Sequence, residues 1–158
     1  MGGSNEARVS EWWIDEPLVK ASMNPTDTML GRLRAQGFTL LVSLLDEQRE
    51  RPEYDVRSTV VAGWTRRTFE IPEGEAPTVG QLVEIIGTIR AAPSGTKALV
   101  HCSTGRGRAA TIGAAYWIDA GLSPQAAISR VSAETGRGFV TADRERVLTD
   151  FATRKRTH

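Results

Sequence analysis

The chain has a single cysteine, Cys102, and it stands between a short apolar segment and a loop that contains glycine. Residues 98–101 have the length and apolar character of a buried strand, and residues 103–108 carry two glycines and two arginines. Residues 109–120 then predict a helix rich in small side chains, which Gly121 ends. This order of strand, glycine loop and helix N-terminus is typical of an anion site, because the first helical amides lack intrahelical partners and carry positive partial charge.

The residues of this loop also indicate which chemistry it supports. Gly105 and Gly107 let the backbone curl so that successive N–H groups converge on one centre, as a tetrahedral anion requires. Arg108 offers two parallel donors to two phosphoryl oxygens and stays charged at any relevant pH. The same positive surroundings stabilise a cysteine as its thiolate, which makes a nucleophile without a metal ion. We therefore expect Cys102 to attack a phosphoryl group that the loop holds.

Apolar segments of strand length alternate with helical patterns along the rest of the chain. Residues 38–45 and 65–71 predict strands, and residues 17–22 predict a first strand or hairpin. The charged residues 46–58 predict a surface loop or a short helix. This alternation predicts an α/β fold, with a central, mainly parallel sheet of four or five strands flanked by helices. In such sheets, ligands bind beyond the carboxyl ends of the strands.

Several helix starts carry their own capping signals. Thr78 and Gln81 form a capping box in front of an apolar stripe at helical spacing, and Ser123 is followed by proline at the first helical position. We expect Asn24 with Pro25 to begin an earlier helix, and Thr141 to cap the last one.

Length and composition restrict the broad class of protein. The chain has 158 residues, which suits one domain, residues 1–158, of which 1–10 are expected to be flexible. The formal net charge of +1 favours no nucleic-acid partner, and no segment approaches the length of a membrane span. One cysteine and two histidines form neither a disulfide nor a zinc site, so we expect no metal and no cofactor. The lone thiol and the missing export signal predict a cytoplasmic protein.

The loop resembles the signature loop of the protein-tyrosine and dual-specificity phosphatases. The resemblance is carried by His101 before the cysteine, Gly105 three residues after it and Arg108 six residues after it. Upstream, residues 71–78 read Ile-Pro-Glu-Gly-Glu-Ala-Pro-Thr, which is similar to the acid segment of the small atypical and archaeal-type enzymes. The resemblance covers most of the chain from about Trp12 onward.

The resemblance implies a role for each residue of the loop. Cys102 would form a thiophosphate intermediate, Arg108 would bind its equatorial oxygens, and His101 would anchor the loop and tune the thiol. The phosphate cradle would be completed by the backbone amides of Ser103, Thr104, Gly105, Arg106 and Gly107. The partners implied are phosphorylated proteins, through phosphotyrosine and also phosphoserine or phosphothreonine, or small phosphomonoesters.

Two positions depart from the family pattern. The general acid of the family is usually Asp, and the matching position here is Glu73, which is one methylene longer. Asp46, just past the predicted strand 38–45, is the substitute or accessory carboxylate. The second departure is Ala109, where the family has a Ser or Thr whose hydroxyl bonds the sulfur. We expect a less stabilised thiolate here and slow breakdown of the phosphocysteine.

Other functions compete with the phosphatase interpretation. A binding module could keep the cradle, capture phosphorylated partners and turn them over poorly; Ala109 and Glu73 keep this alternative open. The extra charge of Arg106 resembles that of phosphoinositide phosphatases. A rhodanese-type sulfurtransferase also uses a cysteine in an anion loop, but the spacing from Cys102 to Arg108 fits phosphate better. A Walker-type nucleotide site would need Gly-Lys-Ser or Gly-Lys-Thr after the glycines, which this loop lacks.

Overall fold

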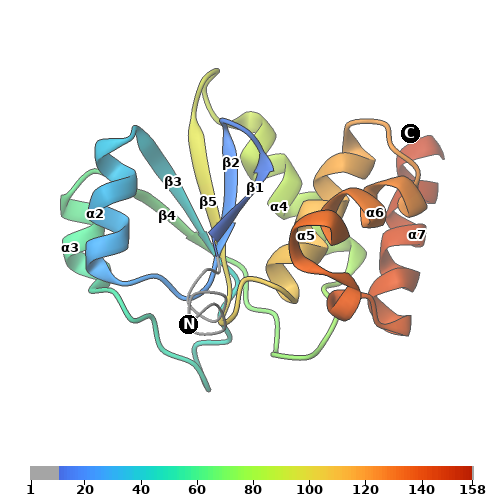
Figure 1. Cartoon of the computed structure of the whole chain (residues 1–158), viewed down its shortest axis with the longest axis horizontal. Helices are drawn as coiled ribbons and strands as arrows, with labels where there is room; N and C mark the ends of the chain where they lie inside the picture. The colour runs from blue at the N-terminus through green and yellow to red at the C-terminus, as the bar shows by residue number, and fades with distance from the viewer. Residues whose placement is uncertain (1–10, 158) are drawn as a thin grey trace.

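The computed structural model describes residues 11–157, in which a five-stranded sheet lies between two groups of helices (Figure 1). The expected flexibility of residues 1–10 lies outside the described residues. The strand order is β1-β2-β5-β3-β4, where the strands are β1 (Glu11–Asp15), β2 (Val19–Ser22), β3 (Phe38–Ser43), β4 (Thr65–Thr68) and β5 (Lys97–His101). Only the β1–β2 pair is antiparallel, so the prediction of a mainly parallel sheet is confirmed.

The parallel register aligns the carboxyl ends of four strands at one edge of the sheet. Ser22 of β2 and Ser43 of β3 both pair with His101 of β5, and Ser43 also pairs with Thr68 of β4. Segments that leave these strand ends therefore start side by side. The loop that follows His101 occupies the middle of this edge because β5 is the central strand.

The two faces of the sheet have separate apolar cores. One is covered by α2 (Asp27–Ala35) and α3 (Val56–Val61), and its buried side chains include Leu33, Leu41 and Leu99. The other is covered by α4 (Val79–Ala91), α5 (Arg108–Asp119) and α6 (Pro124–Thr135). The last helix, α7 (Ala142–Thr157), packs on these helices away from the sheet, and a short 3-10 helix η1 (Arg137–Phe139) precedes it (Figure 1). Neighbouring residues of β3 alternate between these cores, as the period of two along a strand requires.

The capping signals locate most helix starts correctly. The capping box of Thr78 and Gln81 is formed in full, and Ser123 accepts from the amide of Ala126 at 3.1 Å. The expectation that Asn24 and Pro25 begin α2 was wrong. Thr26 is the N-cap, and the Asn24 side chain instead bonds the backbone of the 46–55 segment, at Arg51 and Glu53.

Within residues 11–157, no helix combines the length and the apolar character that crossing a bilayer requires.

Candidate active site

The loop 102–108 is braced on its outer side by the β1–β2 hairpin and the turn after it. The indole Nε1 of Trp12 donates to the carbonyl of Gly105 at 2.9 Å, and the amide of Asn24 donates to the carbonyl of Ser103 at 3.0 Å. In a trans peptide the N–H points opposite to the C=O. Two carbonyls fixed outward therefore turn the amides of Thr104 and Arg106 to the other side, and the amide of Arg106 donates to the Thr104 hydroxyl at 3.2 Å.

Gly105 is required at its position for two independent reasons. Its φ is +82°, in the left-handed region that favours glycine. A Cβ there would also lie 2.6 Å from the carbonyl carbon of Ser22, closer than real contacts allow. The loop thus packs directly on the end of β2, and only glycine permits that approach.

The sulfur of Cys102 lies at the floor of the loop. The residue is 1% exposed, and its Sγ accepts a hydrogen bond from the amide of Gly105 at 3.2 Å. The sulfur thus lies beside a backbone donor of its own loop.

Arg108, the first residue of α5, is 2% exposed and pairs with Glu50. Its Nη1 and Nη2 donate to the two carboxylate oxygens of Glu50, each at 2.7 Å, and Nη1 also donates to the carbonyl of Ile71 at 2.8 Å. This bidentate pair fixes the guanidinium plane. Burial lowers the pKa of Arg108, but the hydrogen bond to Glu50 and the negative charges of Cys102, Glu50 and Glu73 outweigh it and raise the pKa overall.

Glu50 was missed in the sequence because it is one of many charges in the 46–58 loop. Its pKa is lowered, chiefly by the hydrogen bond from Arg108, while partial burial acts in the opposite direction. The amide of Asp46 donates to Glu50 Oε1 at 2.9 Å and holds the carboxylate in place. One feature of the sequence could have singled out Glu50: it lies a few residues past the predicted strand 38–45, and the carboxyl ends of parallel strands share the edge of the sheet at which the loop arginine lies.

His101 anchors the loop as a neutral side chain. It is fully buried, its Nε2 lies 2.8 Å from the hydroxyl of Tyr54, and its Nδ1 lies 3.5 Å from the carbonyl of Cys102. The Tyr54 hydroxyl accepts from Nε of Arg66 at 2.9 Å, so its own proton is available for Nε2. This assigns the Nδ1–H tautomer. Arg66 in turn pairs with Glu47 at 2.6 Å, and the chain of contacts ties the 46–54 loop to the floor of the site.

The buried imidazole predicts a specific pH dependence of stability. Burial, aided by Arg66 and Arg108, lowers the pKa of His101 from 6.5 to about 3, although the Cys102 carbonyl favours the charged form. Below pH 6.5 the unfolded chain therefore binds a proton that the native state excludes, so stability present above that pH is lost as the pH falls. We expect the wild type to lose about 2 kcal/mol more than His101→Gln on going from about pH 7.5 to about pH 5. Urea unfolding at the two pH values measures this difference; equal losses would contradict it.

The two candidate acids have different surroundings. Glu73 is exposed in the turn after Ile71, and its charge acts on Arg108. Asp46 is half-buried directly after the buried Leu45 and lines a 310 Å³ pocket with Arg49, Pro72 and Glu75. Among the described residues, neither candidate acid makes a hydrogen bond to the loop 102–108, and Glu50 is the carboxylate that touches Arg108.

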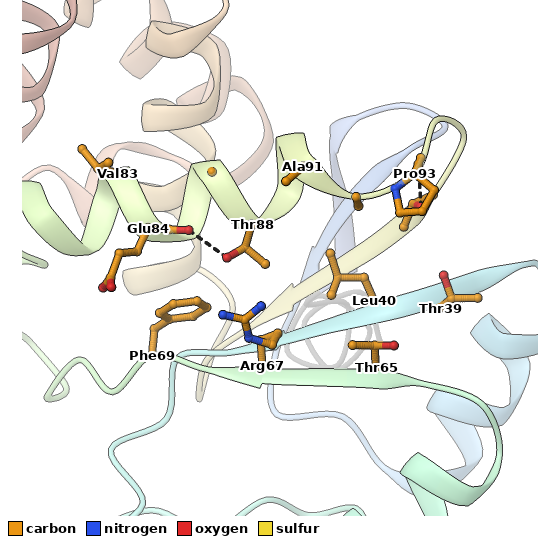
Figure 2. Close-up of a pocket in the computed structure, with 13 residues that line it drawn as sticks. Thr39, Leu40, Thr65, Arg67, Phe69, Val83, Glu84, Thr88, Ala91 and Pro93 are labelled. Carbon is orange, nitrogen blue, oxygen red and sulfur yellow. Dashed lines mark hydrogen bonds between the residues drawn. The ribbon is translucent and has the colours of Figure 1, made fainter.

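A larger cavity lies apart from this site. It has a volume of about 640 Å³ and is lined by β3, β4 and α4, with Arg67 and Phe69 beneath Val83 and Glu84 (Figure 2). None of its lining residues belongs to the loop 102–108.

Comparison with known proteins identifies the family. A family model described as polymorphic toxin system, DSP-PTPase phosphatase (Tc-R-P) matches residues 18–122, two thirds of the chain including the whole loop. The chain belongs to this family. It is therefore a phosphatase of the cysteine-dependent, dual-specificity type.

Solved structures share its fold over nearly the whole length. Tk-PTP in its active form is 29% identical, with 92% of this chain and 98% of that chain covered at a TM-score of 0.82. PTPMT1 in complex with PI(5)P is 20% identical (93% and 97% covered, TM-score 0.83), and human DUSP28 is 19% identical (92% and 95%, TM-score 0.75). The last two show the fold alone. A search of curated proteins gave no match.

Proposed function

We propose that this phosphatase hydrolyses phosphomonoesters through a phosphocysteine intermediate on Cys102, with Arg108 binding the phosphoryl oxygens. The observation that carries the proposal is the Gly105 amide 3.2 Å from Sγ, inside a loop whose last residue is a buried, carboxylate-fixed arginine. A buried sulfur that served only for packing would need neither the inward amide nor the guanidinium.

The proposed reaction has two steps. The thiolate attacks phosphorus, the P–S bond forms as the P–O bond to the leaving group breaks, and a carboxylic acid gives the leaving oxygen its proton. Water then attacks phosphorus, the carboxylate left by the first step takes its proton, and the P–S bond breaks, which releases phosphate and restores the thiolate. Arg108 and the loop amides from Ser103 to Gly107 would hold the charge on the phosphoryl oxygens in both steps. The amide of Arg106 would exchange the Thr104 hydroxyl for a phosphoryl oxygen.

The wild-type protein allows a direct test of the proposal. We expect hydrolysis of p-nitrophenyl phosphate, inhibition by vanadate and, after acid quenching, a phosphoryl adduct on the peptide that contains Cys102, detected by mass spectrometry. Phosphate binding without turnover would favour the alternative of a binding module for phosphorylated partners, for which the buried Ala109 without a hydroxyl is the supporting feature. Turnover that survives alkylation of the thiol would contradict Cys102 as the nucleophile.

The substrate class is proposed to be phosphotyrosine in proteins, with small aryl phosphates as surrogates. Because Cys102 is buried, a long side chain such as phosphotyrosine reaches it more readily than phosphoserine or phosphothreonine does. PTPMT1 was solved with PI(5)P, and the exposed Arg106 keeps a phosphoinositide as the alternative. Rates on a phosphotyrosine peptide, a phosphoserine peptide and PI(5)P separate these classes. The free thiol further supports a reducing, cytoplasmic location.

Glu73 is proposed as the general acid, because it holds the position of the family's acid and its charge is close enough to act on Arg108. Glu73→Gln is expected to lower kcat on phenyl phosphate by about 100-fold, since that leaving group needs a proton, and much less on p-nitrophenyl phosphate. Asp46→Asn is the matched comparison on the same rim. If Asp46→Asn shows this leaving-group dependence and Glu73→Gln does not, the acid is Asp46.

A further inference from the structure

Arg144, on the first turn of α7, is buried without a charged partner. It is 6% exposed, and its Nη1 donates to the carbonyl of Phe139 at 3.2 Å. Its Nε is fully buried and has no hydrogen-bond partner among residues 11–157. No salt bridge within that part of the chain includes this residue. An unpaired buried cation is costly, so its charge calls for a compensating anion.

The guanidinium of Arg144 lies against the phosphate loop. Its Nη2 is 3.3 Å, and its Cζ 3.7 Å, from the position that a Cβ on Gly107 would take. Burial lowers the pKa of Arg144, the negative charge of Cys102 acts in the opposite direction, and the positive charge of Arg108 lowers the pKa further. The charges that act on this side chain are thus the two central groups of the site.

The free side of this guanidinium suits a tetrahedral anion. Nε and Nη2 form the edge that an arginine uses to bind two oxygens at once, and Nη1 alone is held by Phe139. This edge therefore contains the unpaired Nε–H and also Nη2, the guanidinium atom nearest the loop.

We propose that Arg144 is a second phosphoryl-binding residue, whose Nε–Nη2 edge donates to the anion held in the loop 102–108. This inference rests on the proposed function, because it needs a phosphoryl group at Cys102. Two guanidiniums, from the amino ends of α5 and α7, would then bind one anion. The site would favour dianionic monoesters over diesters, since a diester carries one charge less.

Phosphate affinity tests the inference in variants that keep the fold. Arg144→Gln keeps a polar side chain but loses the charge and the two-oxygen edge. We expect it to weaken binding of inorganic phosphate by about 10-fold or more in calorimetry, and to lower kcat/KM for p-nitrophenyl phosphate at least as much. Arg146→Gln is the matched control, because Arg146 is exposed on the same helix and pairs at the surface with Asp143.

Each outcome decides the question. Unchanged phosphate affinity in a folded Arg144→Gln, judged by its thermal unfolding, would overturn the inference. If Arg144→Gln does not fold, phosphate affinity is measured on Arg144→Lys instead, and the wild type is studied by NMR. In ¹⁵N-labelled wild type, the Arg144 Nε–H signal should shift as phosphate saturates the loop amides; no shift at saturation overturns the inference. A wild type that binds no phosphate contradicts the proposed function itself and this inference with it.

Discussion

Cys102→Ser is expected to lower kcat/KM for p-nitrophenyl phosphate on the order of 10⁴-fold or more. The serine hydroxyl stays protonated and is therefore a much weaker nucleophile than the cysteine thiolate. The replacement is nearly isosteric, and the Gly105 amide, 3.2 Å from Sγ, can donate to the hydroxyl oxygen instead. The fold and the loop should therefore persist. Steady-state kinetics with a thermal unfolding curve for each protein measures both properties.

Ser103→Ala is the matched control, since the proposed role of Ser103 is carried by its backbone amide. It should change kcat/KM only a few-fold. Comparable turnover in wild type and Cys102→Ser would remove the phosphocysteine from the mechanism, whatever the substrate.

Arg108→Lys is expected to lower kcat/KM on the order of 10³-fold, although the charge is kept. Lysine cannot donate to two oxygens in one plane, so it loses both the phosphoryl grip and the two 2.7 Å bonds to Glu50. Glu50 would then be left partly buried with a poorer partner, and we also expect a loss of stability of about 2 kcal/mol. Calorimetry of phosphate binding, kinetics and urea unfolding separate the two effects.

Arg106→Lys serves as the control for Arg108→Lys, because Arg106 lies in the same loop and is exposed. It should keep kcat/KM within a few-fold. If Arg108→Lys retains turnover within 10-fold of the wild type, bidentate binding by Arg108 is not part of the mechanism.

The fold could be predicted from sequence where the signal is local. Alternating apolar strands and helix caps such as Thr78 and Ser123 depend on neighbouring residues, and both caps are formed. The start of α2 was wrong because Asn24 and Thr26 are both good caps, and the choice is made by the distant partners Arg51 and Glu53. Residues 65–71 predicted one strand, but β4 ends at Thr68, and beyond it the amides of Phe69 and Ile71 bond to the carbonyls of Ser43 and Leu44.

The positions of Cys102 and Arg108 could be predicted because the loop is continuous in sequence. Its supports could not, since they come from elsewhere in the chain. Trp12 holds Gly105 across 93 residues, Glu50 holds Arg108 across 58, and Tyr54 holds His101 across 47. No spacing rule links a tryptophan in a first strand to a glycine carbonyl, and charges in a surface loop do not show which of them turn inward.

The indole of Trp12 that bonds Gly105 makes the reactivity of the thiol a reporter on the first hairpin. If β1 detaches from β2, the Gly105 carbonyl loses its hydrogen-bond donor, and the loop loses its outer support. The four parallel strands β2, β5, β3 and β4 would stay paired. Slow alkylation of the cysteine by iodoacetate in an otherwise folded protein would then signal that β1 has come away, well before any global melting is seen.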